Sequence, residues 1–328
     1  MDELRHFMND RVRQLEDWCA EQLGALVSFE PLARDASTRQ FYRATVSDGS
    51  RIAMDAPPET ENNAQFRALS GLFRSNGVPV PEVFAFDPRG FLLVSDFGDR
   101  RFDHAYAEGR EEQCLDLALG ALLRIQSVES DIIPPYEISR FRDELGIFTE
   151  WLVQRFLGLE TPAFIDDAWE TLIEATQAQP MVTVHRDYHS RNLLLCGDGS
   201  LGIVDFQDAL VGPVTYDLVS LLRDCYHVFP EATVAERLTR YLHLADCGMT
   251  ARDFRRAFDL TGVQRHLKAA GIFARLKLRD GRDSHLHDIA PTLRRVADVT
   301  AGYPELLDLS RWVGNVVLPT VIRELGRR

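Results

Sequence analysis

The chain has 328 residues, of which 45 % are hydrophobic and 27 % charged, and its length and composition predict a globular protein of two domains or lobes. The formal net charge of −13 argues against a nucleic-acid-binding groove, because phosphate binding needs a basic face. No run of about 18 apolar residues and no apolar signal-peptide core is present, so we expect a soluble cytoplasmic protein with no membrane partner.

The first hundred residues predict a small sheet accompanied by helices. Apolar residues at helical spacing predict an opening helix over 4–23, and the same spacing recurs over 61–77. The predicted strands are rich in β-branched and aromatic residues and cover 26–33, 40–47, 51–56, 81–87 and 91–98. Asp48-Gly49 is a turn that joins the second and third strands into a hairpin.

Helical patterns dominate the rest of the chain. They cover 110–128, 138–157, 163–178, 215–228, 231–246, 250–279, 285–300 and 303–326. Short strands interrupt them only at 181–184, 193–196 and 201–206. The pattern predicts an α+β fold of two lobes, with a β-rich N-terminal lobe over 1–97 and a larger, mainly helical C-terminal lobe over 98–328.

One motif concentrates the chemistry. His185-Arg186-Asp187, four further residues and Asn192 have the form H-R-D-x-x-x-x-N, and Asp205 follows thirteen residues later. In phosphoryl transfer the first Asp accepts the proton of the attacking hydroxyl, while the Asn and the second Asp hold Mg²⁺ on the nucleotide phosphates. A hairpin between "LLLC" and "LGIVD" would bring Asp205 beside Asn192. The alternative is that these residues only form turns and cap a strand.

The run "HRDYHSRN…IVDFQDALVGPVTYDL" resembles the aminoglycoside phosphotransferase and choline kinase family, whose fold is protein-kinase-like. The resemblance implies an ATP- and Mg²⁺-dependent kinase in which Asp187 is the catalytic base and Asn192 and Asp205 bind the metal. It makes the N-terminal lobe nucleotide-binding and the C-terminal lobe catalytic and substrate-binding. Asp217 matches a family Asp at a helix start, where it can brace the active-site loop.

The segment between the first two strands, "RDASTRQ", contains no glycine, unlike the phosphate-binding loop of most kinases. Contacts to the phosphates would come from backbone N–H groups and the hydroxyls of Ser37 and Thr38, with Arg39 adding positive charge. An ordinary polar hairpin turn is the alternative interpretation. The connector after the fifth strand, at Ser95, Asp96 and Phe97, is expected to meet the adenine base.

The third strand departs from the family pattern. Met54 stands about where kinases of this fold carry a phosphate-binding lysine, and the chain has only two lysines, Lys268 and Lys277. Either Arg39 or Arg43 supplies the missing charge, or the protein is a pseudokinase that binds nucleotide without transferring phosphate. We favour an active enzyme, because the base and both metal ligands are present.

In most relatives a helix glutamate pairs with the phosphate-binding lysine. Glu59 or Glu61 occupies that place in this sequence. Because the lysine itself is missing, the sequence leaves open what pairs with this glutamate.

Four segments, "DASTRQFYRA", "MDAPPE", "SDFG" and "SLLRDCY", are most similar to bacterial kinases that phosphorylate the anomeric hydroxyl of N-acetylmuramate and N-acetylglucosamine in peptidoglycan recycling. The resemblance implies a small-molecule amino sugar as the acceptor. A hemiacetal hydroxyl is more acidic than an ordinary alcohol, so positioning and charge neutralisation can carry most of the rate. An aminoglycoside or amino-alcohol kinase is the alternative within the same chemistry.

The expected sugar contacts lie in or just after the motif region and are Tyr188, His189, Gln207, Arg223 and Asp224. Arg223 would pair with the lactyl carboxylate of N-acetylmuramate, which N-acetylglucosamine lacks. The alternative for Arg223 is a salt bridge to Asp224 or to a neighbouring helix. The sequence gives no indication of an oligomeric state.

Overall fold

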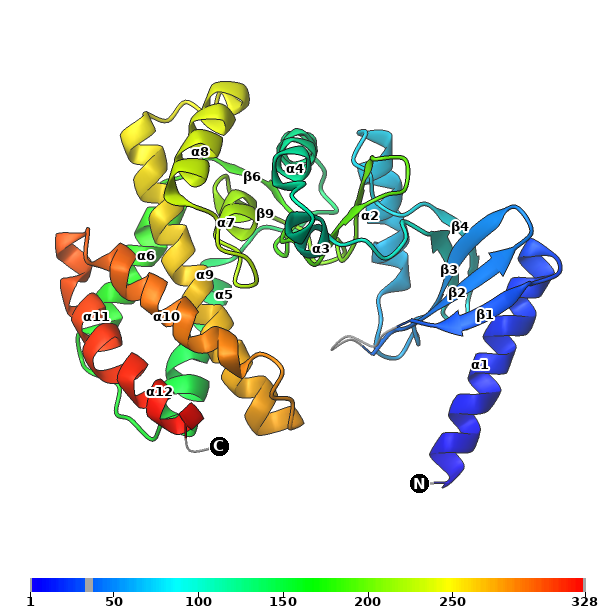
Figure 1. Cartoon of the computed structure of the whole chain (residues 1–328), viewed down its shortest axis with the longest axis horizontal. Helices are drawn as coiled ribbons and strands as arrows, with labels where there is room; N and C mark the ends of the chain where they lie inside the picture. Colours follow the sequence, from blue (N-terminus) through cyan, green and yellow to red (C-terminus); the bar gives the residue numbers. More distant parts are fainter. Residues whose placement is uncertain (1, 33–37, 327–328) are drawn as a thin grey trace. The chain divides into compact units, whose positions relative to one another are not determined.

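The computed structural model describes residues 2–32 and 38–326, with side chains from residue 10 onward within these ranges. Packing divides the chain into two compact units: a first unit of Met1–Arg124 with Arg191–Gln207, and a second unit of Ile125–Ser190 with Asp208–Arg328. Figure 1 shows the elements of both units in chain order. The boundaries of these units differ from those of the predicted lobes, 1–97 and 98–328. The assignment of the lobes stays a prediction.

A five-stranded antiparallel sheet forms the first part of the first unit, in the order β1-β2-β3-β5-β4. The strands are β1 (Ser28–Pro31), β2 (Gln40–Val46), β3 (Gly49–Asp55), β4 (Val83–Asp87) and β5 (Phe91–Ser95). Met54 of β3 lies opposite Phe41 of β2 and Leu92 of β5. The five predicted strands are therefore confirmed; four are shorter than predicted, and β3 begins two residues earlier and ends one residue earlier.

Helix α1 (Asp2–Leu23) packs on this sheet and α2 (Asn63–Ser75) follows β3. Leu15, Trp18 and Cys19 of α1 are buried in one apolar cluster with strand residues. These positions recur every three or four residues, so one face of the helix is apolar, as the sequence pattern predicts. Two further helices, α3 (Phe102–Ala107) and α4 (Glu111–Gln126), follow the sheet, and α3 was not predicted.

The predicted hairpin after the motif is present. Strands β7 (Leu193–Leu195) and β8 (Leu201–Ile203) pair antiparallel, with Leu193 opposite Ile203. Gly202 is required here, because a Cβ at this position would lie 2.4 Å from atoms of the Phe97 ring. The hairpin therefore packs closely against the connector after β5.

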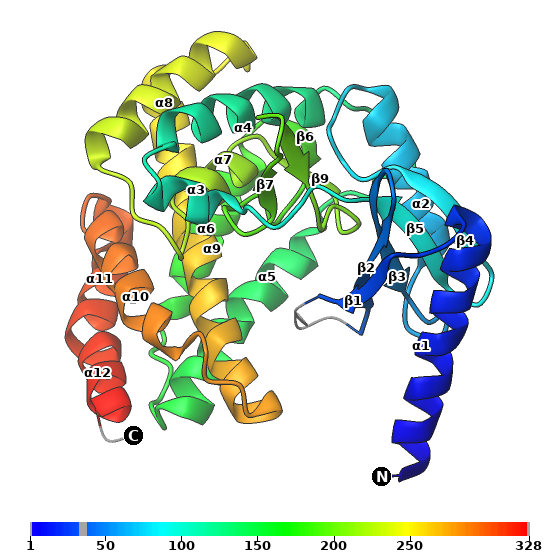
Figure 2. The same ribbon diagram turned by 45° about the vertical axis from the view of Figure 1, so that its right-hand side comes forward.

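The second unit is mainly helical (Figure 2). Its elements are α5 (Ile138–Ile147), η1 (Phe148–Phe156), α6 (Ile165–Gln177), β6 (Met181–Val184), β9 (Leu210–Pro213), α7 (Tyr216–Leu222), α8 (Glu231–Ala245), α9 (Ala251–Asp280), α10 (Leu286–Thr300), η2 (Pro304–Leu306), α11 (Leu307–Trp312), η3 (Val313–Val317) and α12 (Leu318–Gly326). Among the described helices, none is both long and apolar enough to cross a bilayer.

Helix α9 is the central element of the second unit. It packs against α5, η1, α6, α7 and α10, and it is buried on most of its circumference. The approach to α5 is so close that a Cβ at Gly271 would lie 2.7 Å from the backbone of Ile147. This packing fixes the direction of the polar side chains on the buried part of α9.

Candidate active site

The first unit contains a cavity of about 460 Å³, which we call the first cavity and which is within the usual size range of small-molecule sites. Its apolar walls come from Phe41, Ile52, Met54, Phe66, Val94 and Phe206. Ser95, Asp96 and Phe97, the predicted adenine segment, all line it. An apolar slot beside strand-end backbone suits a flat aromatic base.

Met54 is buried in the wall where a phosphate-binding lysine was expected. Directly before β2, Arg39 also lines this cavity and forms a salt bridge to Glu61, with 2.7 Å between Nη2 and Oε2. The hydroxyl of Thr38 donates to the same carboxylate. Of Glu59 and Glu61, it is therefore Glu61 that has an arginine as its partner. Ser37, the other predicted phosphate contact in this segment, lies outside the described residues.

Arg43 has a different environment. Its Nε donates to Asp96 at 2.7 Å and its Nη1 donates to Asp99 at 2.8 Å. Hydrogen bonds to Asp99 and Asp96 raise the pKa of the guanidinium, which stays charged. Because two carboxylates already neutralise Arg43, it holds the Asp96 segment in place, and Arg39 is the better candidate for a phosphate contact.

Asn192 and Asp205 lie together in the first unit, as predicted. The Asn192 Nδ2 atom is 3.4 Å from Asp205 Oδ2, and the Val204 N–H donates to the Asn192 carbonyl at 3.0 Å. Asp205 has a φ of +65°, a conformation that costs energy for a residue with a side chain and is common at active sites. The hairpin therefore holds the two side chains next to each other.

The donor set of these two residues fits Mg²⁺. Amide and carboxylate oxygens are hard ligands, and Mg²⁺ needs few from the protein when a nucleotide supplies the rest. Within the described ranges no group of three or more His, Cys, Asp or Glu side chains is arranged to hold a metal ion, so a site closed by protein ligands alone is not found there.

Gln207 was predicted to contact the sugar, and the structure places it elsewhere. Its Nε2 donates to Asp205 Oδ1 at 2.6 Å, and it lines the first cavity. Gln207 therefore belongs with the expected metal ligands. The residue follows Asp205 by only two positions, which explains why the hairpin carries it to the same place.

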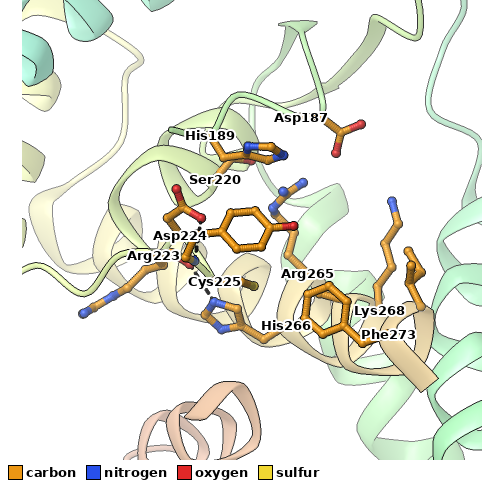
Figure 3. Close-up of a pocket in the computed structure, with 13 residues that line it drawn as sticks. Asp187, His189, Ser220, Arg223, Asp224, Cys225, Arg265, His266, Lys268 and Phe273 are labelled. Carbon is orange, nitrogen blue, oxygen red and sulfur yellow. Dashed lines mark hydrogen bonds between the residues drawn. The ribbon is translucent and has the colours of Figure 1, made fainter. Parts of the chain in front are cut away.

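The second unit contains a smaller cavity of about 190 Å³, the second cavity, which Asp187 lines. Figure 3 shows Arg265 and Lys268 extending from α9 toward Asp187, with His189 beside it. Burial alone would raise the pKa of the Asp187 carboxyl, but the charges of Lys268 and Arg265 outweigh burial and lower that pKa. Asp187 is therefore held as a carboxylate.

The loop that carries Asp187 is strained and firmly supported. Arg186 has a φ of +80°. The backbone N–H groups of His185 and Arg186 donate to the buried Asp217 carboxylate at 2.6 and 2.9 Å, and Arg265 Nη1 donates to the Arg186 carbonyl at 2.7 Å. Burial raises the pKa of Asp217 to about 7 despite these bonds. The predicted bracing role of Asp217 is confirmed.

A buried carboxylate, Glu144, connects this loop to α9. It accepts hydrogen bonds from Lys268 Nζ at 2.9 Å, Arg186 Nη2 at 3.0 Å and Gln264 Nε2 at 3.2 Å. Arg140 Nε lies 3.8 Å from the same carboxylate, so three cations share Glu144, and a part of the Lys268 charge is left for the cavity. Our sequence interpretation missed Lys268 and Arg265, although the rarity of lysine in the chain was a signal.

Of the remaining predicted sugar contacts, some line the second cavity and one does not. Tyr188 is fully buried with its ring 5.7 Å from that of His185, and it does not line the second cavity, so its contact with the sugar stays a prediction. His189 does line the cavity.

Arg223 and Asp224 lie on the wall of the second cavity but already have partners. Arg223 Nη2 donates to Glu231 Oε2 at 2.7 Å, which is the alternative of a salt bridge to a neighbouring helix, and Figure 3 shows its guanidinium directed away from Asp187. Asp224 accepts from the Ser190 N–H at 3.0 Å and the Tyr226 N–H at 2.9 Å. Asp224 thereby supports the end of the Asp187 loop.

The chain is similar to known proteins along most of its length. A model described as a phosphotransferase enzyme family matches residues 28–258. An N-acetylmuramate/N-acetylglucosamine kinase of Pseudomonas aeruginosa is 38% identical over 297 residues, which cover 87% of this chain and 88% of the relative. A kinase of the same name from Neisseria meningitidis is 39% identical over 293 residues, which cover 84% and 87%.

Solved structures share the fold at low sequence identity. A choline kinase from Streptococcus pneumoniae has a TM-score of 0.64 at 13% identity, with 88% of this chain and 99% of that chain covered. An aminoglycoside phosphotransferase in ternary complex with AMP-PNP and hygromycin B has a TM-score of 0.63 at 16% identity, with the same shares covered. The predicted kinase-like α+β fold, with a β-rich N-terminal part and a helical remainder, is confirmed.

Proposed function

The chain belongs to the phosphotransferase enzyme family, and on this premise we propose that it transfers the γ-phosphoryl group of ATP to the anomeric C1 hydroxyl of N-acetylmuramate and N-acetylglucosamine. Two relatives at 38% and 39% identity bear the name of kinases for these sugars, and the similarity extends over most of both chains. The observation that carries the proposal is that Asp187 lines the second cavity and that neighbouring positive charges lower its pKa, which keeps it ionised.

Asp187 is the proposed general base. A base acts by accepting the hydroxyl proton as the bond to phosphorus forms, so it must be unprotonated when the acceptor binds. A lowered pKa makes a carboxylate a weaker base, and this suits a hemiacetal hydroxyl, which is more acidic than an ordinary alcohol. The strained, braced loop supports the proposal, because it fixes the direction of the carboxylate.

The first cavity is the proposed nucleotide site. The adenine base would lie against the segment from Ser95 to Phe97, and Arg39, held by Glu61, would contact the phosphates. Asn192 and Asp205 would hold Mg²⁺, which when bound neutralises phosphate charge. The arginine takes the part that a lysine on β3 has in other kinases, so the absence of that lysine does not argue for a pseudokinase.

Arg265 and Lys268 take over the carboxylate-binding role that Arg223 was predicted to have. Both line the second cavity, and Lys268 shares its carboxylate partner with Arg186. A guanidinium and an ammonium group in one small cavity suit the lactyl carboxylate of N-acetylmuramate. His189 and Asp224 provide polar wall beside them. Acting on these sugars with ATP would give the protein a place in cytoplasmic peptidoglycan recycling.

Product analysis by ³¹P NMR tests this proposal. The protein is incubated with ATP, Mg²⁺ and either sugar, and we expect a new sugar 1-phosphate resonance that Asp187→Asn does not produce. If neither sugar is phosphorylated while AMP-PNP still binds, the anomeric proposal is overturned. A panel of aminoglycosides and amino alcohols then identifies the alternative acceptor.

A further inference from the structure

The second unit contains another cavity, about 670 Å³ and open to solvent, that the proposed reaction does not use. We call it the arginine cavity, because four arginines line it: Arg223 at the end of α7, Arg255 on α9, and Arg294 and Arg295 on α10. The four guanidinium groups outnumber the carboxylates that line the same cavity. The volume is typical of a small-molecule site.

Three carboxylates also line this cavity, and two of them are already engaged. Glu231 binds Arg223, at 2.7 Å, and Arg255, at 3.7 Å. Asp259 accepts from Arg255 Nε at 2.9 Å and from the Tyr303 hydroxyl at 2.9 Å. The third, Asp298, is exposed. Arg223 and Arg255 are therefore neutralised within the cavity wall.

Arg295 is different. It is half-buried on α10, and among the described residues it has no hydrogen bond and no carboxylate at salt-bridge distance. Burial lowers the pKa of its guanidinium, and the charge of Arg223 lowers it further. The carboxylates of Glu231 and Asp224 favour the charged form of Arg295, but they act from beyond salt-bridge distance and do not outweigh burial and Arg223. A guanidinium taken out of water with such incomplete neutralisation destabilises the folded protein.

An anion in the cavity would remove this cost. We propose that the arginine cavity binds a small phosphomonoester, with Arg295 as the main contact and Arg294 at the rim. A guanidinium presents its donors in a planar fork that matches phosphate oxygens, and several guanidinium groups suit a dianion better than a single carboxylate. The volume leaves room for an organic group on the phosphate.

The position of Arg223 connects this cavity to the second cavity. Arg223 lines both, and its neighbour Asp224 holds Ser190, the residue at the end of the Asp187 loop. Its backbone carbonyl lies 2.8 Å from His266 Nε2. Arg223 is therefore a wall residue that the two cavities have in common.

Thermal unfolding of the full chain tests the binding site without any need for turnover. We compare the wild type, Arg295→Met and the exposed control Arg311→Met, each with and without glycerol 3-phosphate at constant ionic strength. Without the anion, Arg295→Met should raise the Tm by about 1–3 °C, because it removes an incompletely neutralised charge. Adding glycerol 3-phosphate should raise the Tm of the wild type and of the control more than that of Arg295→Met.

Isothermal titration with glycerol 3-phosphate should show at least a tenfold weaker Kd in Arg295→Met than in Arg311→Met. Phosphate bound in the other cavities is common to all three proteins, so the difference between variants is the measurement. A lower Tm for Arg295→Met together with an unchanged response to the anion overturns the proposal, since Arg295 would then be structural. An equal response to acetate overturns the choice of a phosphomonoester.

Discussion

The first and second cavities differ in how their charges are arranged. In the first, each candidate cation has an acidic partner of its own, Arg39 with Glu61 and Arg43 with Asp96 and Asp99, between apolar walls. In the second, Arg265 and Lys268 act together on Asp187. The first arrangement suits a large ligand held mainly by shape, and the second keeps one reactive group ionised. If the two cavities have these separate functions, changes in one should leave the function of the other unchanged.

Asp187→Asn should have the largest effect, because it removes the carboxylate that the charges of the second cavity keep ionised. We expect kcat to fall by about 10²- to 10⁴-fold with both sugars while the KM for ATP changes little. Steady-state kinetics measure both parameters, and Asp308→Asn, a change at an exposed residue, is the control. A comparable rise in the KM for ATP would show that the two cavities are not independent in function.

Lys268→Met should affect the two sugars unequally. Loss of a charged contact to the lactyl carboxylate should lower kcat/KM for N-acetylmuramate about 10- to 100-fold more than for N-acetylglucosamine. The chain provides a matched control in its only other lysine, and Lys277→Met, which affects a surface pair with Asp283, should leave the ratio unchanged. Equal losses for both sugars would mean that Lys268 acts through Glu144 and Asp187 and does not contact the lactyl carboxylate.

Gly202→Ala probes the shape of the first cavity. The added methyl group would displace the Phe97 ring, so we expect the KM for ATP to rise about fivefold while the KM for the sugar stays the same. Gly197→Ala, in the turn of the same hairpin, adds a methyl group where the structure leaves open space and serves as the control. If both variants behave alike, Phe97 does not form part of the nucleotide site.

The smallest expected effect is a displaced pH profile. Asp187 must be ionised to act, so activity is lost as the pH falls through its pKa, which Lys268 lowers. Removing that charge in Lys268→Met should raise the pKa and move the acidic limb of log kcat/KM for N-acetylglucosamine to higher pH. The Lys277→Met profile should follow the wild type. A limb that stays in place would mean that Arg265, His189 and Arg186 keep Asp187 ionised without Lys268.

Local patterns in the sequence determined most of the fold. Alternating β-branched and aromatic residues identify the strands of the first unit, and helical periodicity identifies the long helices of the second. The spacing of Asp187, Asn192 and Asp205, together with the turn between β7 and β8, predicted that the last two lie side by side. Short elements escaped detection: β9 contains Gly212 and Pro213, which indicate a turn rather than a strand.

The tertiary structure alone decided which side chains meet around Asp187. Lys268 and Arg265 follow it by about 80 residues, on a helix that is buried almost all round, so no periodic apolar face indicates which way its polar residues point. The packing of α9 against α5 and α7 sets that direction. The pairing of Arg39 with Glu61 is a similar case. The sequence shows that both residues carry charge, but it does not show that they meet, because contacts between residues distant in the chain leave no local signal.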